Sequence, residues 1–98
     1  MTQEEIEIKQ HSIEATTEKF CLILWNDNVN DWTDVVTSLC EVCQITSEEG
    51  YKLMLLAHTQ GNSIVRHGSK GELLKLQSGL TLRNLTTTIE SVTESSRN

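Results

Sequence analysis

In the stretch Phe20-Cys21-Leu22-Ile23-Leu24-Trp25-Asn26-Asp27-Asn28, six apolar residues are followed directly by three short polar ones. An apolar run of this length is typical of a strand that is covered on both faces. The side chains of Asn and Asp bond to their own backbone, so the three residues that follow favour a turn. We therefore expect a buried strand over residues 20–25 that ends in a polar turn.

Two helices are expected after this turn. Asp31 stands at the N-cap position of the first, and Asp34 lies near the positive end of its dipole. The inner stripe of this helix recurs at helical spacing and comprises Trp32, Val35, Val36, Leu39, Val42 and Cys43. The second helix begins with the capping-box pattern Thr46-Ser47-Glu48-Glu49. It is expected to stop at Gly61, which can take the left-handed conformation.

The C-terminal half adds two strands and a helix. Residues 63–67 form a short strand, and residues 86–92, which are rich in β-branched side chains, form a closing one. Between them, the capping box Ser69-Lys70-Gly71-Glu72 opens a helix. Its apolar stripe comprises Leu73, Leu76 and Leu80. Gly71 and Gly79 weaken this helix by up to ~1 kcal/mol each.

The resulting order, β-α-α-β-α-β, predicts an α+β fold in which a three-stranded antiparallel sheet carries three helices on one face. One domain is expected over residues 19–93, because 98 residues are too few for two. Residues 1–18 are acidic and polar with scattered apolar groups, and we interpret them as a flexible N-terminal arm. Within this arm, Ile6-Glu7-Ile8 has the pattern of an edge strand. Residues 94–98 form a polar tail.

The composition excludes several classes of function. The formal net charge of -6 argues against nucleic acid or an anionic membrane as a partner, because both require a basic surface. No stretch approaches the run of about 20 apolar residues that crosses a bilayer. The acidic start, Met1-Thr2-Gln3-Glu4-Glu5, is unlike a secretory signal, so we expect a cytoplasmic protein. The odd number of cysteines, three, favours reduced thiols.

Two groups of polar residues are candidates for binding. Asn26, Asp27 and Asn28 follow a buried strand and precede a helix, where three short polar side chains could converge on a cation or an amine. From the residues alone, a turn with a helix cap is the favoured interpretation. His58 shares a helix face with Met54, one turn away. It is either a satisfied, half-buried side chain or a hydrogen-bonding group at the edge of an apolar patch.

An enzyme site is not evident. Cys40-Glu41-Val42-Cys43 has redox-motif spacing, but both thiols fall late in the predicted helix, far from the helix N-terminus that would depress a thiol pKa. We expect them to fill core space. A zinc site would need two more suitably spaced ligands, and His58 and His67 do not supply them. No cofactor is implied, and no nucleophile elbow or P-loop is present.

Taken together, these segments resemble the ClpS family of Clp protease adaptors. The strand and turn over residues 22–30 resemble the family's hydrophobic strand ending in Asn-Asp-Asp. Residues 52–61 resemble its second helix, in which a methionine is followed by a histidine and then a glycine. Residues 68–73 and 87–90 are also similar, so the resemblance covers about residues 19 to 92. It implies the ClpS fold, which is also that of the ribosomal stalk C-terminal domain.

The resemblance also implies a function. ClpS proteins bind N-degrons, which are proteins that begin with Phe, Tyr, Trp or Leu, and deliver them to an AAA+ unfoldase–protease. By position, Asn26, Asp27 and His58 would hold the α-amino group of the substrate. The side-chain pocket would comprise Asn28, Asn30, Trp32, Val35, Met54 and Ala57. Glu72 and Lys75 would contact the N-terminal domain of a ClpA- or ClpC-like unfoldase.

Three positions depart from the family pattern: Asp31 replaces a common proline or threonine, and Asn28 and Trp32 leave alternatives open. Asn28 replaces a second aspartate, and Trp32 replaces a methionine gate, so its indole is expected to narrow the pocket, exclude tryptophan and favour leucine or phenylalanine. An alternative is a regulatory protein that docks on the unfoldase without recognising degrons. A third reading, a thiol oxidoreductase that uses Cys40 and Cys43, is the least favoured.

Overall fold

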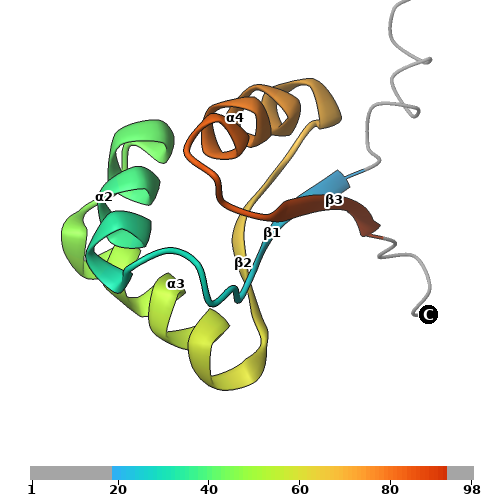
Figure 1. Cartoon of the computed structure of the whole chain (residues 1–98). Helices are drawn as coiled ribbons and strands as arrows, with labels where there is room; N and C mark the ends of the chain where they lie inside the picture. The colour runs from blue at the N-terminus through green and yellow to red at the C-terminus, as the bar shows by residue number, and fades with distance from the viewer. Residues whose placement is uncertain (1–18, 93–98) are drawn as a thin grey trace, which may run out of the picture.

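The fold follows the predicted order of elements (Figure 1). A computed structural model describes residues 19–92, so the predicted arm, its possible edge strand and the polar tail lie outside the described residues. The elements are β1 (Lys19–Trp25), α2 (Trp32–Cys43), α3 (Ser47–Gln60), β2 (Asn62–Gly68), α4 (Lys70–Leu82) and β3 (Thr87–Val92). The α+β class and the β-α-α-β-α-β order are confirmed.

The sheet has three strands in the order β2-β1-β3, and both pairings are antiparallel. The apolar run therefore forms the central strand. Leu22 and Leu24 point to the helical side and belong to the main core cluster. Cys21 and Ile23 point to the opposite side, where cross-strand neighbours flank them, yet both are buried. Because β1 is buried on both faces, apolar and polar residues do not alternate along it.

The three helices cover the Leu22 side of the sheet. The core cluster draws on all of them, and its buried members there are Val35, Leu39, Cys43, Met54, Ala57, Leu73 and Leu80. Helices α2 and α4 pack closely where Gly79 faces Val42, because a Cβ added at Gly79 would lie 2.8 Å from Val42 Cγ1. Gly79 therefore serves a close helix contact, and α4 runs unbroken past it.

The predicted caps agree with the structure in three cases and differ in one. Thr46 and Ser69 accept the backbone N–H of Glu49 and Glu72, as their capping boxes require. Gly61 ends α3 in the left-handed region with φ of 97°. Asp31 occupies the N-cap position of α2, but its side chain makes no capping hydrogen bond.

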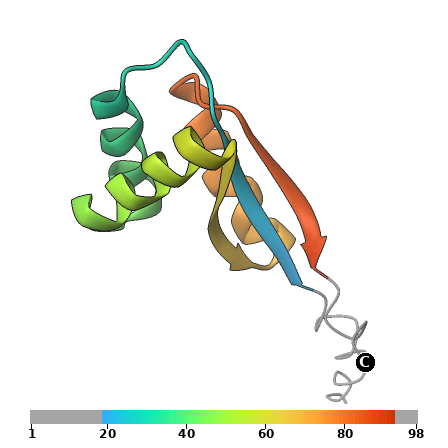
Figure 2. The same ribbon diagram turned by 90° about the horizontal axis from the view of Figure 1, so that it is seen from below.

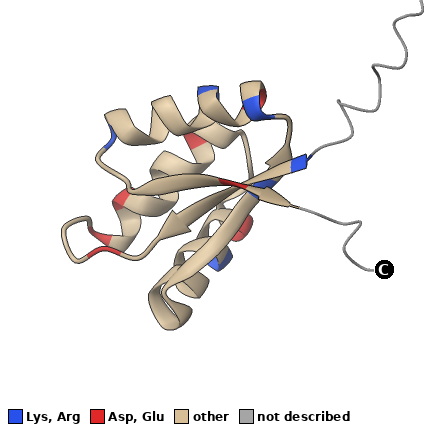
Figure 3. Ribbon diagram, turned by 90° about the vertical axis from the view of Figure 1, so that its right-hand side faces the viewer, with Lys and Arg blue, Asp and Glu red and all other residues tan. Residues whose placement is uncertain are grey.

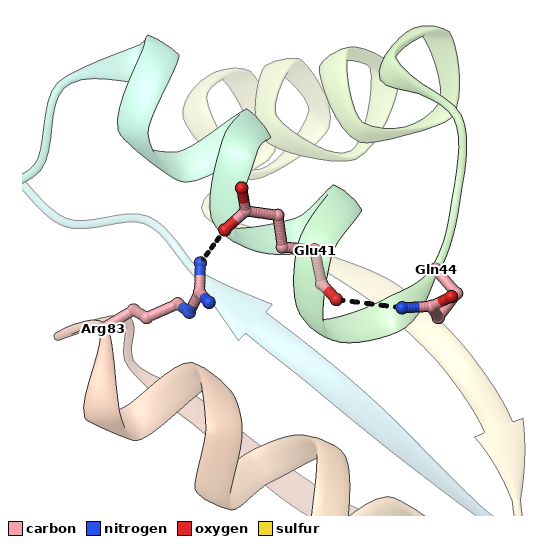
Figure 4. Close-up of polar contacts among 3 residues, drawn as sticks. All are labelled: Glu41, Gln44 and Arg83. Carbon is pink, nitrogen blue, oxygen red and sulfur yellow. Dashed lines mark hydrogen bonds and ion pairs between the residues drawn. The ribbon is translucent and has the colours of Figure 1, made fainter.

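An ion pair joins the end of α4 to α2, and a hydrogen bond lies within the C-terminal turn of α2 (Figure 4). Arg83, which follows α4, donates Nη1 to the carboxylate of Glu41 on α2, and Gln44 Nε2 donates to the Glu41 carbonyl at 3.2 Å. The ion pair holds the C-terminal end of α4 beside α2. Among residues 19–92, no helix has both the length and the apolar character that a membrane span requires.

Candidate functional site

The polar turn after β1 lies beside the turn between α4 and β3, as the view from below shows (Figure 2). Backbone hydrogen bonds fix this end of β1: Trp25 N–H donates to the carbonyl of Thr86, and Asn26 N–H donates to the carbonyl of Gly61, both at 2.9 Å. The strand end is thus joined to the end of α3 and to the start of β3. Residues far apart in the sequence meet there.

A small cavity of about 20 Å³ opens at this meeting point. That is room for about one water molecule. Its lining residues come from β1 and its turn, from α2, from α3 and from the segment before β3: Leu24, Trp25, Asn26, Asp27, Asn30, Trp32, Val35, Met54, Ala57, His58 and Leu85. The cavity therefore has a polar side and an apolar side.

Asp27 is the charged group of the polar side. Its Oδ1 accepts the backbone N–H groups of Val29 and Asn30, each at 2.9 Å, and its Oδ2 accepts Asn30 Nδ2 at 3.3 Å. Burial alone would raise the pKa of Asp27, but the hydrogen bonds from Asn30 and Val29 outweigh it and hold the pKa below its ordinary value. Asp27 is therefore a carboxylate at neutral pH, and these bonds fix its orientation.

Asn30 joins Asp27 to the opposite side of the cavity. The same Nδ2 that reaches Asp27 also donates to the carbonyl of Asn84 at 2.8 Å. Asn84 takes the left-handed conformation, with φ of 68°, and the next residue, Leu85, turns back into the core. One amide thus connects the turn that carries Asp27 with the segment that carries Leu85.

His58 and Trp32 lie at the mouth of the cavity. Their ring centroids are 4.9 Å apart in an edge-on arrangement with an interplanar angle of 65°. Edge-on ring pairs contribute about 0.5–1.5 kcal/mol beyond the area that they bury. Trp32 is the first residue of α2, and 47% of it remains exposed. The indole therefore contacts the imidazole on one side and solvent on the other.

The apolar side is formed by buried core residues. Leu24, Met54, Ala57, Val35 and Leu85 all belong to the core cluster. Each is held by packing on several sides, so this side of the cavity is rigid compared with its mouth.

Eight of the predicted site residues line the cavity: Asn26, Asp27, Asn30, Trp32, Val35, Met54, Ala57 and His58. Asn28 does not line it and is exposed in the turn. Glu72 and Lys75 are exposed on α4, away from the cavity. Three lining residues were missed by the sequence reasoning: Leu24, Trp25 and Leu85. The first two directly precede Asn26, which was a usable signal, whereas Leu85 offered none.

The local charge around the cavity is negative. Acidic residues occur in the connection after β1 and in the first turn of α2, as the charge-coloured ribbon shows (Figure 3). Asp27, Asp31 and Asp34 are the residues concerned. A negative field of this kind favours a positively charged group at the cavity mouth.

The cysteines at positions 21, 40 and 43 do not line the cavity. Cys43 is fully buried at the end of α2, and burial raises the pKa of its thiol, although the nearby charge of Arg66 acts in the opposite direction. Arg66 Nη2 donates to the Cys43 carbonyl at 2.6 Å. Over residues 19–92, no group of three or more His, Cys, Asp or Glu residues is placed to hold a metal ion.

Comparison with known proteins identifies the fold and the family. No curated protein sequence gave a significant match. Among solved structures, Agrobacterium tumefaciens ClpS2 bound to L-phenylalaninamide is similar in fold, with a TM-score of 0.71 and 21% sequence identity. The match covers 76% of this chain and 98% of that one. The family model of the ATP-dependent Clp protease adaptor protein ClpS matches residues 15–87. The chain therefore belongs to the ClpS family of Clp protease adaptors.

Proposed function

We propose that this chain binds proteins with a free N-terminal Leu, Phe, Tyr or Trp and delivers them to a Clp AAA+ unfoldase–protease. The observation that carries the proposal is the cavity, which brings Asn26, Asp27 and His58 together beside an apolar wall. An N-degron presents a charged amine and an apolar side chain on the same α-carbon. The two sides of the cavity match these two groups.

The polar side has the chemistry that an α-ammonium requires. An ammonium donates three hydrogen bonds and is stabilised by acceptors in fixed positions. Asp27 supplies a charge-assisted bond, and its orientation is fixed before the ligand enters. Asn26 and His58 supply the remaining acceptors. Acetylation of the amine would remove its charge and two of its donors, so only an unblocked N-terminus is expected to bind.

A structural relative carries a ligand of matching chemistry. The Agrobacterium ClpS2 chain was solved with L-phenylalaninamide, which has a free amine and a benzyl side chain. In our chain, Met54, Ala57, Val35 and Leu85 line the apolar side of the cavity, and this supports an apolar side chain as the second part of the ligand. A small apolar pocket with a few placed polar groups discriminates by size and charge.

The partner that we propose is the N-terminal domain of a ClpA- or ClpC-like unfoldase, in the cytoplasm. Glu72 and Lys75 are exposed on α4 and are available for a protein contact. The negative net charge fits a protein partner better than nucleic acid or membrane.

Titration with fluorescent peptides tests the proposal. Peptides that begin with Leu, Phe, Tyr, Trp or Met are each compared with their N-acetylated form, using the wild-type, Asp27→Ala and His58→Ala proteins. Saturable binding of the free peptides that acetylation abolishes and both variants weaken is the expected result. Asn28→Ala is the matched control, because Asn28 lies in the same turn but not on the cavity. If no free peptide binds, degron recognition is refuted.

A second candidate function is supported by the position of Trp32. Its indole contacts the His58 ring edge-on, and the cavity that both residues line is small. A chain whose cavity stayed closed would keep the adaptor fold and act as a regulatory protein that docks on the unfoldase without binding degrons. Binding to a Clp N-terminal domain without any peptide binding is the result that would favour this alternative.

A further inference from the structure

A second hollow adjoins the cavity on the surface between α2 and α3, which lie side by side (Figure 1, Figure 2). It is a groove of about 280 Å³, far larger than the cavity of about 20 Å³. Trp32 and Met54 line both hollows, so the groove and the cavity are neighbours. The lining residues of the groove are Trp32, Thr33, Val36, Thr37, Tyr51 and Met54.

The groove is lined by the kinds of side chain that bind apolar ligand groups. Trp32 and Tyr51 are 47% and 48% exposed, although they are large aromatic residues. Met54 is buried and Val36 packs against the core cluster, so these two close the groove on the side of the core. Three of the four aromatic residues of the chain, Trp25, Trp32 and Tyr51, line either the groove or the cavity. Ligand sites are lined mainly by apolar and aromatic side chains with a few polar groups. An apolar side chain that enters from solvent fits this lining.

A close contact fixes the spacing of α2 and α3 beside the groove. Gly50 of α3 is buried, and a Cβ added there would lie 3.1 Å from Cys40 Sγ and 3.3 Å from Val36 Cγ1. Packing as tight as this leaves the two helices little freedom to shift against each other. The groove is therefore formed before a ligand arrives.

The position of the groove determines which residue of a bound chain reaches it. Groups that contact one side chain from opposite sides lie about 7–8 Å apart, which is twice a contact distance of about 3.5–4.0 Å. In an extended chain, side chains two residues apart point the same way and lie about 6.6 Å apart, whereas the one between them points to the other face. Because the two hollows share Trp32 and Met54, a chain with its first side chain in the cavity brings its third to the groove.

We propose that the groove between α2 and α3 is a subsite for the third residue of the bound N-terminus, and that it favours a large apolar side chain. This inference rests on the proposed function. The amine is held beside Asp27, the first side chain meets the apolar side of the cavity, and the chain continues over Trp32. The third side chain is then removed from water in the groove, which strengthens binding. The second side chain points to solvent, so its identity has little effect.

Peptides that differ only in the position of one leucine test the subsite. Three peptides that begin Phe-Ala-Leu, Phe-Leu-Ala and Phe-Ala-Ala, each continued by the same polar sequence, are titrated against the wild-type protein. Leucine in the third position should strengthen binding by about fivefold over alanine, because the groove buries part of the side chain. Leucine in the second position should change the affinity by less than about twofold.

Filling the groove should remove this preference. Thr37→Phe places a ring in the groove from an exposed position of α2. Thr81→Phe is the matched control, because Thr81 is exposed on α4 and lines neither hollow. The gain from the third-position leucine should fall below about twofold in Thr37→Phe and stay at about fivefold in Thr81→Phe. Tyr51→Ala removes one side of the groove and should also reduce the gain, so the test stands even where Thr37→Phe does not fold.

The outcomes separate the subsite from the proposed function. Equal affinities for the three peptides, an equal gain from leucine in the second and third positions, or a gain that survives in both Thr37→Phe and Tyr51→Ala would overturn the subsite and leave recognition of the first residue standing. A wild-type chain that sediments as a dimer, beside a monomeric Thr37→Phe, would assign the groove to a second copy and would also overturn it. If the wild-type protein binds none of the peptides, the proposed function fails, and the subsite fails with it.

Discussion

Replacing Asn30 by Ala should weaken the binding of the α-amine, although it changes none of the three residues proposed to hold that amine. The change removes two hydrogen bonds of one Nδ2 group, one to Asp27 Oδ2 at 3.3 Å and one to the carbonyl of Asn84 at 2.8 Å. The backbone bonds to Asp27 Oδ1 remain. A net hydrogen bond is worth about 0.5–1.5 kcal/mol, and both of these are at least partly reached by solvent. We therefore expect a loss of about 1–2 kcal/mol in the free energy of unfolding.

Asn30→Ala should also weaken peptide binding, because it changes the orientation and the pKa of the Asp27 carboxylate. Without the Asn30 side chain, Asp27 is less firmly oriented and its pKa lies closer to the ordinary value. A loss of about 0.5–1.5 kcal/mol corresponds to about twofold to tenfold weaker binding of every free N-terminal peptide, whatever its side chain. The distinguishing measurement is the pH dependence of that binding.

The sign of the pH effect is fixed by the direction of the shift. The pKa of Asp27 is depressed in the folded protein, so its stabilising contribution is complete above the unfolded-state pKa and is lost as the pH falls through the folded-state pKa. Amine binding needs the carboxylate and should fall over the same acidic range. In Asn30→Ala both losses should occur at higher pH than in the wild type. If Asn30→Ala has the wild-type pH profile, or if Asn28→Ala shifts it equally, the positioning role of Asn30 is refuted.

Further predictions concern packing and caps, each checked by chemical denaturation. Gly79→Ala should lower the free energy of unfolding by about 1–2 kcal/mol, because the new Cβ would lie 2.8 Å from Val42. Gly71→Ala should raise it by about 0.5–1 kcal/mol, because the new Cβ meets nothing within 4 Å. Equal effects of the two substitutions would contradict the close contact between Gly79 and Val42. Leu85→Ala should cost about 2–5 kcal/mol and weaken the binding of Phe-initiated peptides; unchanged binding in the folded variant would remove Leu85 from the pocket. Thr46→Ala should cost about 1 kcal/mol, and a neutral result would show that the cap is unimportant.

The fold was predictable because its signals are local. The apolar run before Asn26 marked the central strand, and the caps at Thr46 and Ser69 and the stop at Gly61 marked helix ends within a few residues. Each of these features depends on neighbours in the sequence and on no distant contact. Asp31 differs: it stands at the N-cap position of α2, as its place in the sequence predicts, but its side chain makes no capping hydrogen bond.

Only those cavity residues that belong to the family motif could be predicted as a site from the sequence. The polar turn after β1 and the Met54–His58 pair could be named in advance because the family motif contains them. Leu85 lies in a loop without periodicity, and only the Asn30–Asn84 hydrogen bond shows why it belongs to the site. The contact between Trp32 and His58 joins residues from two helices, and no local pattern predicts a ring orientation.

The polar and apolar sides of the cavity have different physical origins. Substitutions on the two sides should therefore have different effects on binding and stability. The acceptors of the polar side are set by a short turn, in which Asp27 is oriented by neighbours two and three residues away. The apolar side is set by core packing among β1, the helices and the segment before β3. Changes in the turn should therefore alter affinity for all N-termini with little loss of fold, whereas changes in the wall should alter stability as well as side-chain preference. Trp32 belongs to neither group, because it is exposed and sits at a helix start. A substitution of Trp32 should therefore change side-chain preference while both the turn and the core stay intact.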